Sequence, residues 1–131
     1  MSAAIVGAAR DLIGVRWRHQ GRDPQTGVDC VGLCLFALKA AGFSLPHIPD
    51  YPRRHNGSLL LSALQRHLTR VPVVALASGD IGLFQESGLP IHVGILSREG
   101  EAAVIHAHAR RRKVVEESLN IYGYPHQVFR F

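Results

Sequence analysis

The sequence is short of several features, and each shortage narrows the class of protein. Only two of its 131 residues are cysteines, Cys30 and Cys34, and a spacing of four is no disulfide framework, so free thiols are expected. No apolar run approaches the roughly eighteen residues of a membrane helix, so no membrane partner is expected. The N-terminus lacks a basic segment followed by a long apolar core. We therefore expect cytoplasmic synthesis without a signal peptide.

The composition is that of a folded domain with a basic surface. Hydrophobic residues make up 47% and charged residues 19%, and there is no internal repeat or linker, so a single domain over residues 1–131 is predicted. The net charge of +5 suits an anionic partner, such as nucleic acid or bacterial cell wall, without specifying either. Because aromatics are only 7% and the basic run "HARRRK" (108–113) matches no nucleic-acid-binding motif, we do not expect a nucleic-acid partner.

Helical signals are confined to the first half of the chain. Apolar spacing predicts helices over 2–13, 30–41 and 58–69, with Asp29 as N-cap of the second and Ser58 as N-cap of the third. The turn-rich segment 21–29 is predicted to be a loop. The segment 44–54, with three prolines, is predicted to be extended or turning.

The second half is rich in short β-type runs separated by turn residues. The predicted strands are 73–77, 80–84, 92–97, 103–109, 113–117 and 126–131. Helices followed by strands, rather than alternating with them, predict an α+β fold in which N-terminal helices pack on a C-terminal antiparallel sheet.

Cys30 falls on the first turn of the second predicted helix. Free backbone amides and the helix dipole favour an anion there, so we expect the pKa of the Cys30 thiol to be lowered toward the nucleophilic thiolate. The same amides can donate to an oxyanion. Cys34, one turn further on, reads as a small buried hydrophobe. A zinc site built from both cysteines and histidines has no second ligand pair at metal-binding spacing, so no metal is expected.

A thiolate nucleophile needs a histidine base and a group that orients it, and two adjacent predicted strands carry histidines. A hairpin loop over 98–100 places His92 opposite His106, whereas a loop over 99–101 places it opposite His108. His106 and His108 lie on the same sheet face, so the pairing pattern alone leaves both open as the partner of His92.

Four motifs occur in the order typical of one family: "DCVGL" (29–33), "SGDIGLF" (78–84), "HVGIL" (92–96) and "VIHA" (104–107). Together they resemble the NlpC/p60 cell-wall peptidases, papain-like cysteine hydrolases. The chain most resembles short phage members associated with tail assembly. The resemblance implies hydrolysis of peptidoglycan stem peptides through a thioester acyl-enzyme, without a cofactor, and incorporation into a virion tail beside phage tail proteins.

The resemblance also implies residue roles. Cys30 would be the nucleophile, His92 the general base and His106 the third member that orients His92, with His108 as the alternative third member.

Three further residues, Trp17, Asp29 and Val31, would border the substrate or the oxyanion; Trp17 stands where a tyrosine is common and Val31 where a serine is common. A catalytically inactive tail component of the same fold, which only binds peptide, is the alternative function.

Overall fold

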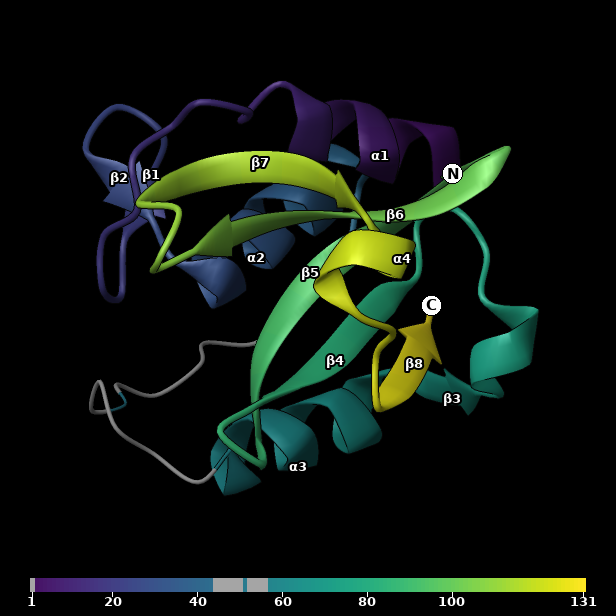
Figure 1. Cartoon of the computed structure of the whole chain (residues 1–131). Coiled ribbons are helices and arrows are strands. Elements are labelled where there is room, and N and C mark those ends of the chain that lie inside the picture. Colours follow the sequence, from purple (N-terminus) through teal and green to yellow (C-terminus); the bar gives the residue numbers. More distant parts are fainter. Residues whose placement is uncertain (1, 44–50, 52–56) are drawn as a thin grey trace.

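The computed structural model describes residues 2–43, 51 and 57–131 (Figure 1). The prediction for 44–54 therefore lies outside the described residues except at Tyr51. The main sheet is antiparallel, with strand order β3-β8-β4-β5-β6-β7. Its strands are β3 (Thr69–Val71), β8 (Gln127–Arg130), β4 (Ile81–Glu86), β5 (Leu89–Glu99), β6 (Glu101–His108) and β7 (Lys113–Ser118).

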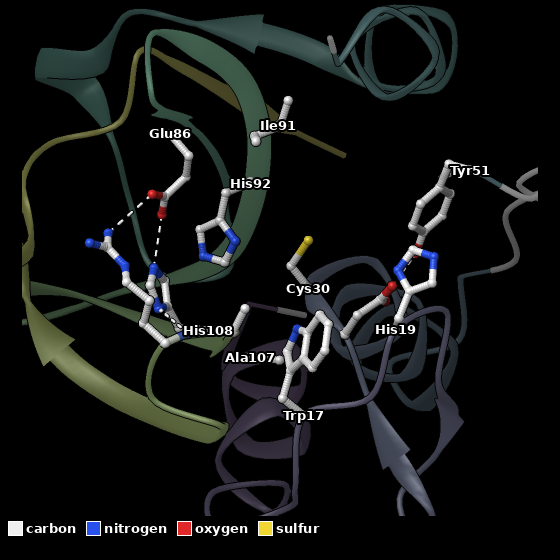
Figure 2. A pocket seen from close by; sticks show the side chains of 12 residues that line it. Trp17, His19, Cys30, Tyr51, Glu86, Ile91, His92, Ala107 and His108 are labelled. Carbon is white, nitrogen blue, oxygen red and sulfur yellow. Dashed lines mark hydrogen bonds and ion pairs between the residues drawn. The ribbon is translucent and has the colours of Figure 1, made fainter. Parts of the chain in front are cut away.

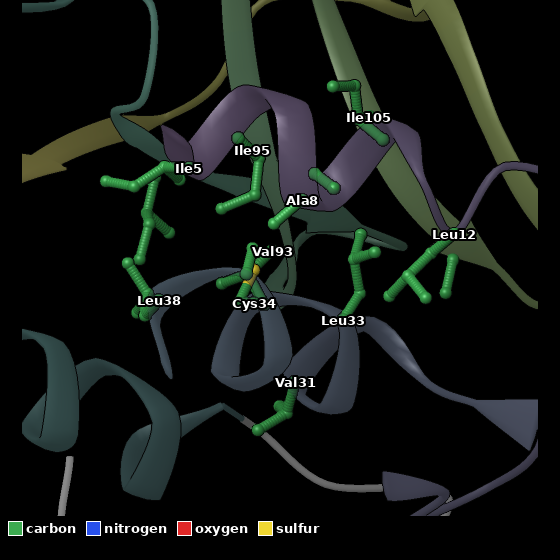
Figure 3. Packing of buried hydrophobic residues seen from close by; sticks show 14 of the residues in the cluster. Ile5, Ala8, Leu12, Val31, Leu33, Cys34, Leu38, Val93, Ile95 and Ile105 are labelled. Atoms are coloured by element: carbon green, nitrogen blue, oxygen red, sulfur yellow. The ribbon is translucent and has the colours of Figure 1, made fainter. Parts of the chain in front are cut away.

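Helices cover both faces of this sheet. They are α1 (Ser2–Arg10), α2 (Cys30–Ala40), α3 (Ser58–His67) and the short α4 (Leu119–Tyr122). Ile5 of α1 and Leu33 of α2 pack with Ile95 of β5 in the larger hydrophobic cluster (Figure 3). A smaller cluster on the alternate sheet positions includes Leu119 of α4. Among the described residues, no helix is long and apolar enough to cross a membrane.

The α+β prediction is confirmed, and four local predictions are wrong. Segment 21–29 is not a simple loop, because β1 (Arg22–Asp23) and β2 (Gly27–Val28) pair within it. Residues 73–77 contain a 3₁₀ turn, Val73–Ala75, after Pro72, which leaves Val74 90% exposed while Leu76 is buried in the smaller cluster. Gly57, not Ser58, is the N-cap of α3. Strand β3 falls at the end of the predicted third helix.

The start of α2 is fixed by a side-chain cap and a close backbone contact. The Asp29 carboxylate accepts a hydrogen bond from the Gly32 N–H at 2.9 Å, as the sequence predicts. A Cβ at Gly32 would lie 2.0 Å from the carbonyl oxygen of Gly21, so only glycine lets the first turn of α2 approach this backbone. Cys30 is therefore held at the N-terminal end of a well-anchored helix.

Strands β5 and β6 stop pairing with each other beyond the first part of their hairpin. Their pairing runs from Glu99 and Glu101 to Ile95 and Ile105, and β5 continues beside β4 while β6 continues beside β7 (Figure 1). The N-terminus of α2 meets the opening between them, since the backbone N–H of Val93 in β5 contacts the Cys30 sulfur.

Candidate functional site

A pocket of about 250 Å³ lies where α2 meets β5 and β6 (Figure 2). It brings together residues from four separate parts of the chain. They are Trp17, His19, Asp29, Cys30, Tyr51, Glu86, Ile91, His92, Ala107, His108, Ala109 and Arg110. The pocket therefore contains both the predicted nucleophile, Cys30, and the predicted base, His92, together with polar and charged side chains.

The Cys30 thiol is protonated at rest, which corrects the sequence prediction of a lowered pKa. Burial and the neighbouring Asp29 charge raise the pKa of Cys30 to about 12, against the weaker opposite effect of the N–H groups of Val93, Val31 and Cys30 itself. The helix N-terminus does act in the predicted direction. It is outweighed because tertiary packing removes water from the sulfur.

His92 lies in a row of hydrogen-bonded side chains. Its Nε2 is 2.7 Å from Nδ1 of His106, and Nε2 of His106 is 2.7 Å from the Glu117 carboxylate. The Arg111 guanidinium donates to the other oxygen of Glu117 at 2.9 Å. Burial, together with His106 and His108, holds the pKa of His92 well below its ordinary value, so His92 is neutral near pH 7. The imidazole of His92 and the thiol of Cys30 are therefore both uncharged at rest.

The structure brings His106, rather than His108, into hydrogen-bond contact with His92. The hairpin register pairs Ile95 with Ile105, which by extension sets Gly94 opposite His106 and His92 opposite His108. A Cβ at Gly94 would lie 3.0 Å from the Cβ of His106, so the missing side chain leaves His106 room to lean toward His92. The glycine of the "HVG" motif thus explains a diagonal contact that strand pairing alone does not predict.

His108 belongs to a second row of side chains. Its Nε2 is 2.9 Å from Glu86, and its ring centroid is 5.3 Å from that of His92. Glu86 also accepts hydrogen bonds from Tyr122 at 2.6 Å and from Arg110 at 3.2 Å. The backbone N–H of Arg110 donates to the other ring nitrogen, Nδ1, at 3.2 Å, so both ring nitrogens of His108 are engaged away from His92.

Two of the three predicted lining residues border the pocket, and one does not. Trp17 and Asp29 line it, but the Val31 side chain faces an apolar cavity with Leu60 and Leu64. One residue of helix advances the side chain by about 100°, so the neighbour of Cys30 points elsewhere. Only the Val31 backbone N–H remains near the sulfur. Cys34 lines the same apolar cavity, apart from the pocket.

Several residues of the site carry no sequence signal of their own. Glu86 and Glu117 partner the histidines, and Arg22 and Tyr51 both contact the buried Asp29 carboxylate. The basic run 108–113 is a sequence feature that marks where these glutamates find positively charged partners. Two of its arginines, Arg110 and Arg111, reach these glutamates, which gives these two residues a structural role.

The raised pKa of Cys30 gives a testable pH dependence. Iodoacetamide reacts with the thiolate, so labelling of Cys30 should keep accelerating with pH beyond about 8.5, the ordinary cysteine value. The rate can be followed by mass spectrometry, with C30A reporting any background from Cys34. A labelling rate that is already maximal below pH 7 would contradict the raised pKa.

Comparisons with known proteins agree on one family. The family model described as NlpC/P60 matches residues 14–130. The NlpC/P60 domain of the peptidoglycan hydrolase SagA superposes with a TM-score of 0.75 at 24% identity, covering 100% of this chain and 99% of that one. No curated protein sequence matches at a significant level.

Other solved structures are longer than this chain. An NlpC/P60 family protein from Bacillus cereus has a TM-score of 0.75 at 23% identity, and this chain, covered entirely, spans only 40% of it. The peptidoglycan hydrolase RipB from Mycobacterium tuberculosis has a TM-score of 0.68 at 21% identity, covering 98% of this chain and 63% of that one. At these identities the likeness shows the shared fold.

Proposed function

The chain belongs to the NlpC/P60 family, and from this premise we propose that it is a cysteine peptidase that hydrolyses amide bonds in peptidoglycan stem peptides. One observation carries the proposal. Cys30 and His92 line the same pocket, and Nε2 of His92 is tied to His106 at 2.7 Å, which leaves Nδ1 of His92 as its free basic atom. Similar solved structures include the peptidoglycan hydrolases SagA and RipB.

The proposed reaction begins from the neutral pair. Nδ1 of His92 takes the thiol proton as the Cys30 sulfur attacks the amide carbonyl carbon. The backbone N–H groups near the sulfur stabilise the negative charge that develops on the carbonyl oxygen of the substrate. The tetrahedral intermediate collapses, the C–N bond breaks, and the proton on His92 passes to the leaving amine. A thioester then joins the substrate acyl group to Cys30.

The second half of the reaction restores the enzyme. His92 takes a proton from water, and the resulting hydroxide attacks the thioester carbonyl. The C–S bond breaks, a carboxylic acid leaves, and the proton returns to the Cys30 sulfur. Because the pKa of Cys30 is raised and that of His92 is lowered, the charged pair arises only during attack, rather than at rest.

Digestion of purified peptidoglycan tests this proposal directly. We expect new amino and carboxyl termini within the stem peptides, identified by mass spectrometry of the soluble products, beside D-glutamate as the family resemblance implies. The absence of stem-peptide cleavage across several peptidoglycan types would overturn it. Where cleavage is found, synthetic stem peptides would identify the bond that is cut.

Association with a phage tail is a second proposal, supported by the likeness of the sequence motifs to short phage members. The alternative, an inactive tail component that binds peptide, predicts binding without turnover. Pull-down of tail proteins together with the digestion assay separates the two. The presence of Cys30 and His92 in one pocket, with His106 bonded to His92, favours turnover.

A further inference from the structure

Glu117 lies at the end of the hydrogen-bonded row that begins with His92 and continues through His106. It lies on β7, its side chain is 14% exposed, and it accepts at 2.7 Å from His106, whose side chain is fully buried. Its second oxygen accepts from Arg111 at 2.9 Å, at the turn between β6 and β7. The carboxylate is thus clamped between a buried imidazole and an exposed cation. The proposed reaction assigns no step to Glu117.

The proton positions along this row follow from the chemistry of its last acceptor. Burial lowers the pKa of His106, so this imidazole is neutral near pH 7 and carries one proton. A carboxylate has no proton to donate, so that proton must be on Nε2, and Nδ1 of His106 must accept. His92 must then donate from Nε2 to that Nδ1. The one atom of His92 left with a free lone pair is Nδ1.

We propose that Glu117 is a positioning residue that holds His106 and His92 in the one tautomer in which Nδ1 of His92 can take the Cys30 proton. The inference rests on the proposed function, since it assigns a purpose to that proton transfer. In the reverse tautomer, His106 would donate from Nδ1 and His92 would carry its proton on Nδ1. That histidine could not accept a proton from a thiol on the same side.

Glu117 stays ionised, which the argument requires. Although partial burial raises the pKa of its carboxyl, the hydrogen bonds and charges of His106 and Arg111 outweigh it, and the pKa of Glu117 lies below its usual value. Among the described residues, no hydrogen bond links the second row of side chains to the first, because Glu86 is bonded to His108 and Tyr122 rather than to His106. The tautomer of His92 is therefore controlled from Glu117.

The test follows tautomers and turnover in the same variants of the full chain. With ¹⁵N-labelled histidine, NMR of the wild type should show Nε2 protonated and Nδ1 unprotonated in both His92 and His106. E117A should give a tautomer mixture and lower kcat on a stem peptide by about 10- to 100-fold, with KM unchanged. E117Q should recover part of this loss, because its amide oxygen can still accept from His106.

E116Q is the matched control, since the neighbouring Glu116 faces the other way and bonds Arg10 and Ser97. It should leave both histidine tautomers and kcat unchanged. Unchanged tautomers in a folded E117A would overturn the inference. If the wild type cleaves no stem peptide while E117A still shifts the tautomers, the proposed function fails and the positioning role of Glu117 stands.

Discussion

Replacing Cys30 by alanine is expected to reduce stem-peptide hydrolysis by about 10⁴-fold or more, the size of loss found when a covalent nucleophile is removed. Among the described residues that line the pocket, no side chain other than Cys30 carries a thiol, and the one hydroxyl belongs to Tyr51, which is bonded to Asp29. The fold should survive, because Cys30 is only half-buried and alanine suits the first turn of α2. Initial rates on a synthetic stem peptide measure the loss, and circular dichroism checks the fold.

Cys34 supplies the matched control for this substitution. C34A also removes one sulfur from α2, but from the apolar cavity beside Leu60. We expect it to lower the free energy of unfolding by about 1 kcal/mol through lost packing and to leave turnover nearly unchanged. Hydrolysis by C30A at even a tenth of the wild-type rate would contradict the assignment of Cys30 as nucleophile.

The sequence predicts those features of the site that depend only on residues close together in the chain. Asp29 caps α2 as predicted because an N-cap requires only neighbouring backbone, and Cys30 follows it directly. The run 73–77 shows the limit of this reasoning. Its β-type residues form a 3₁₀ turn because no strand lies beside them, and strand formation depends on such partners.

The histidines show how a long-range contact escapes local rules. Strand pairing leaves His106 and His108 as alternatives, and the observed register favours His108 as the direct neighbour of His92. The hydrogen bond nevertheless goes to His106, beside Gly94. A glycine in a strand signals close approach of another group, so this contact had a sequence signal that the pairing argument did not use.

Electrostatics were the least predictable part of the site. The N-terminal position of Cys30 argues for a lowered thiol pKa, but the surrounding structure raises that pKa to about 12. Desolvation depends on side chains brought in from β5 and β6, which the sequence around residue 30 does not reveal. Glu117 was missed for a similar reason, since its contact with His106 requires the pairing of β6 with β7.

Asp29 joins the nucleophile helix to the preceding loop. Its carboxylate is 3% exposed and accepts from the N–H groups of Gly32 at 2.9 Å and Gln20 at 2.8 Å. It also forms an ion pair with Arg22 at 2.9 Å and accepts from the Tyr51 hydroxyl. A single buried group therefore satisfies four donors.

The second large effect is therefore expected from D29A, a loss of about 3–5 kcal/mol in the free energy of unfolding. The lost cap and the N–H groups of Gly32 and Gln20, left without an acceptor, account for most of this cost, and the ion pair adds less because the Arg22 side chain is 35% exposed. The first-turn N–H of Gly32 would lose its acceptor, whereas Arg22 would keep its hydrogen bonds to the Gly21 carbonyl and the Tyr51 hydroxyl. Urea denaturation, followed by circular dichroism, measures the change as a lower midpoint at an unchanged slope.

D29N separates the two roles of Asp29, because asparagine can still cap α2 but has no charge. We expect it to be more stable than D29A and to label at Cys30 at a lower pH than the wild type, since the Asp29 charge helps raise the pKa of Cys30. D23A is the matched control, as the exposed Asp23 of β1 accepts only a local turn hydrogen bond from Gln25 and should change stability by less than about 0.5 kcal/mol. Equal urea midpoints for D29A and D23A would show that the buried network does not hold the nucleophile helix in place.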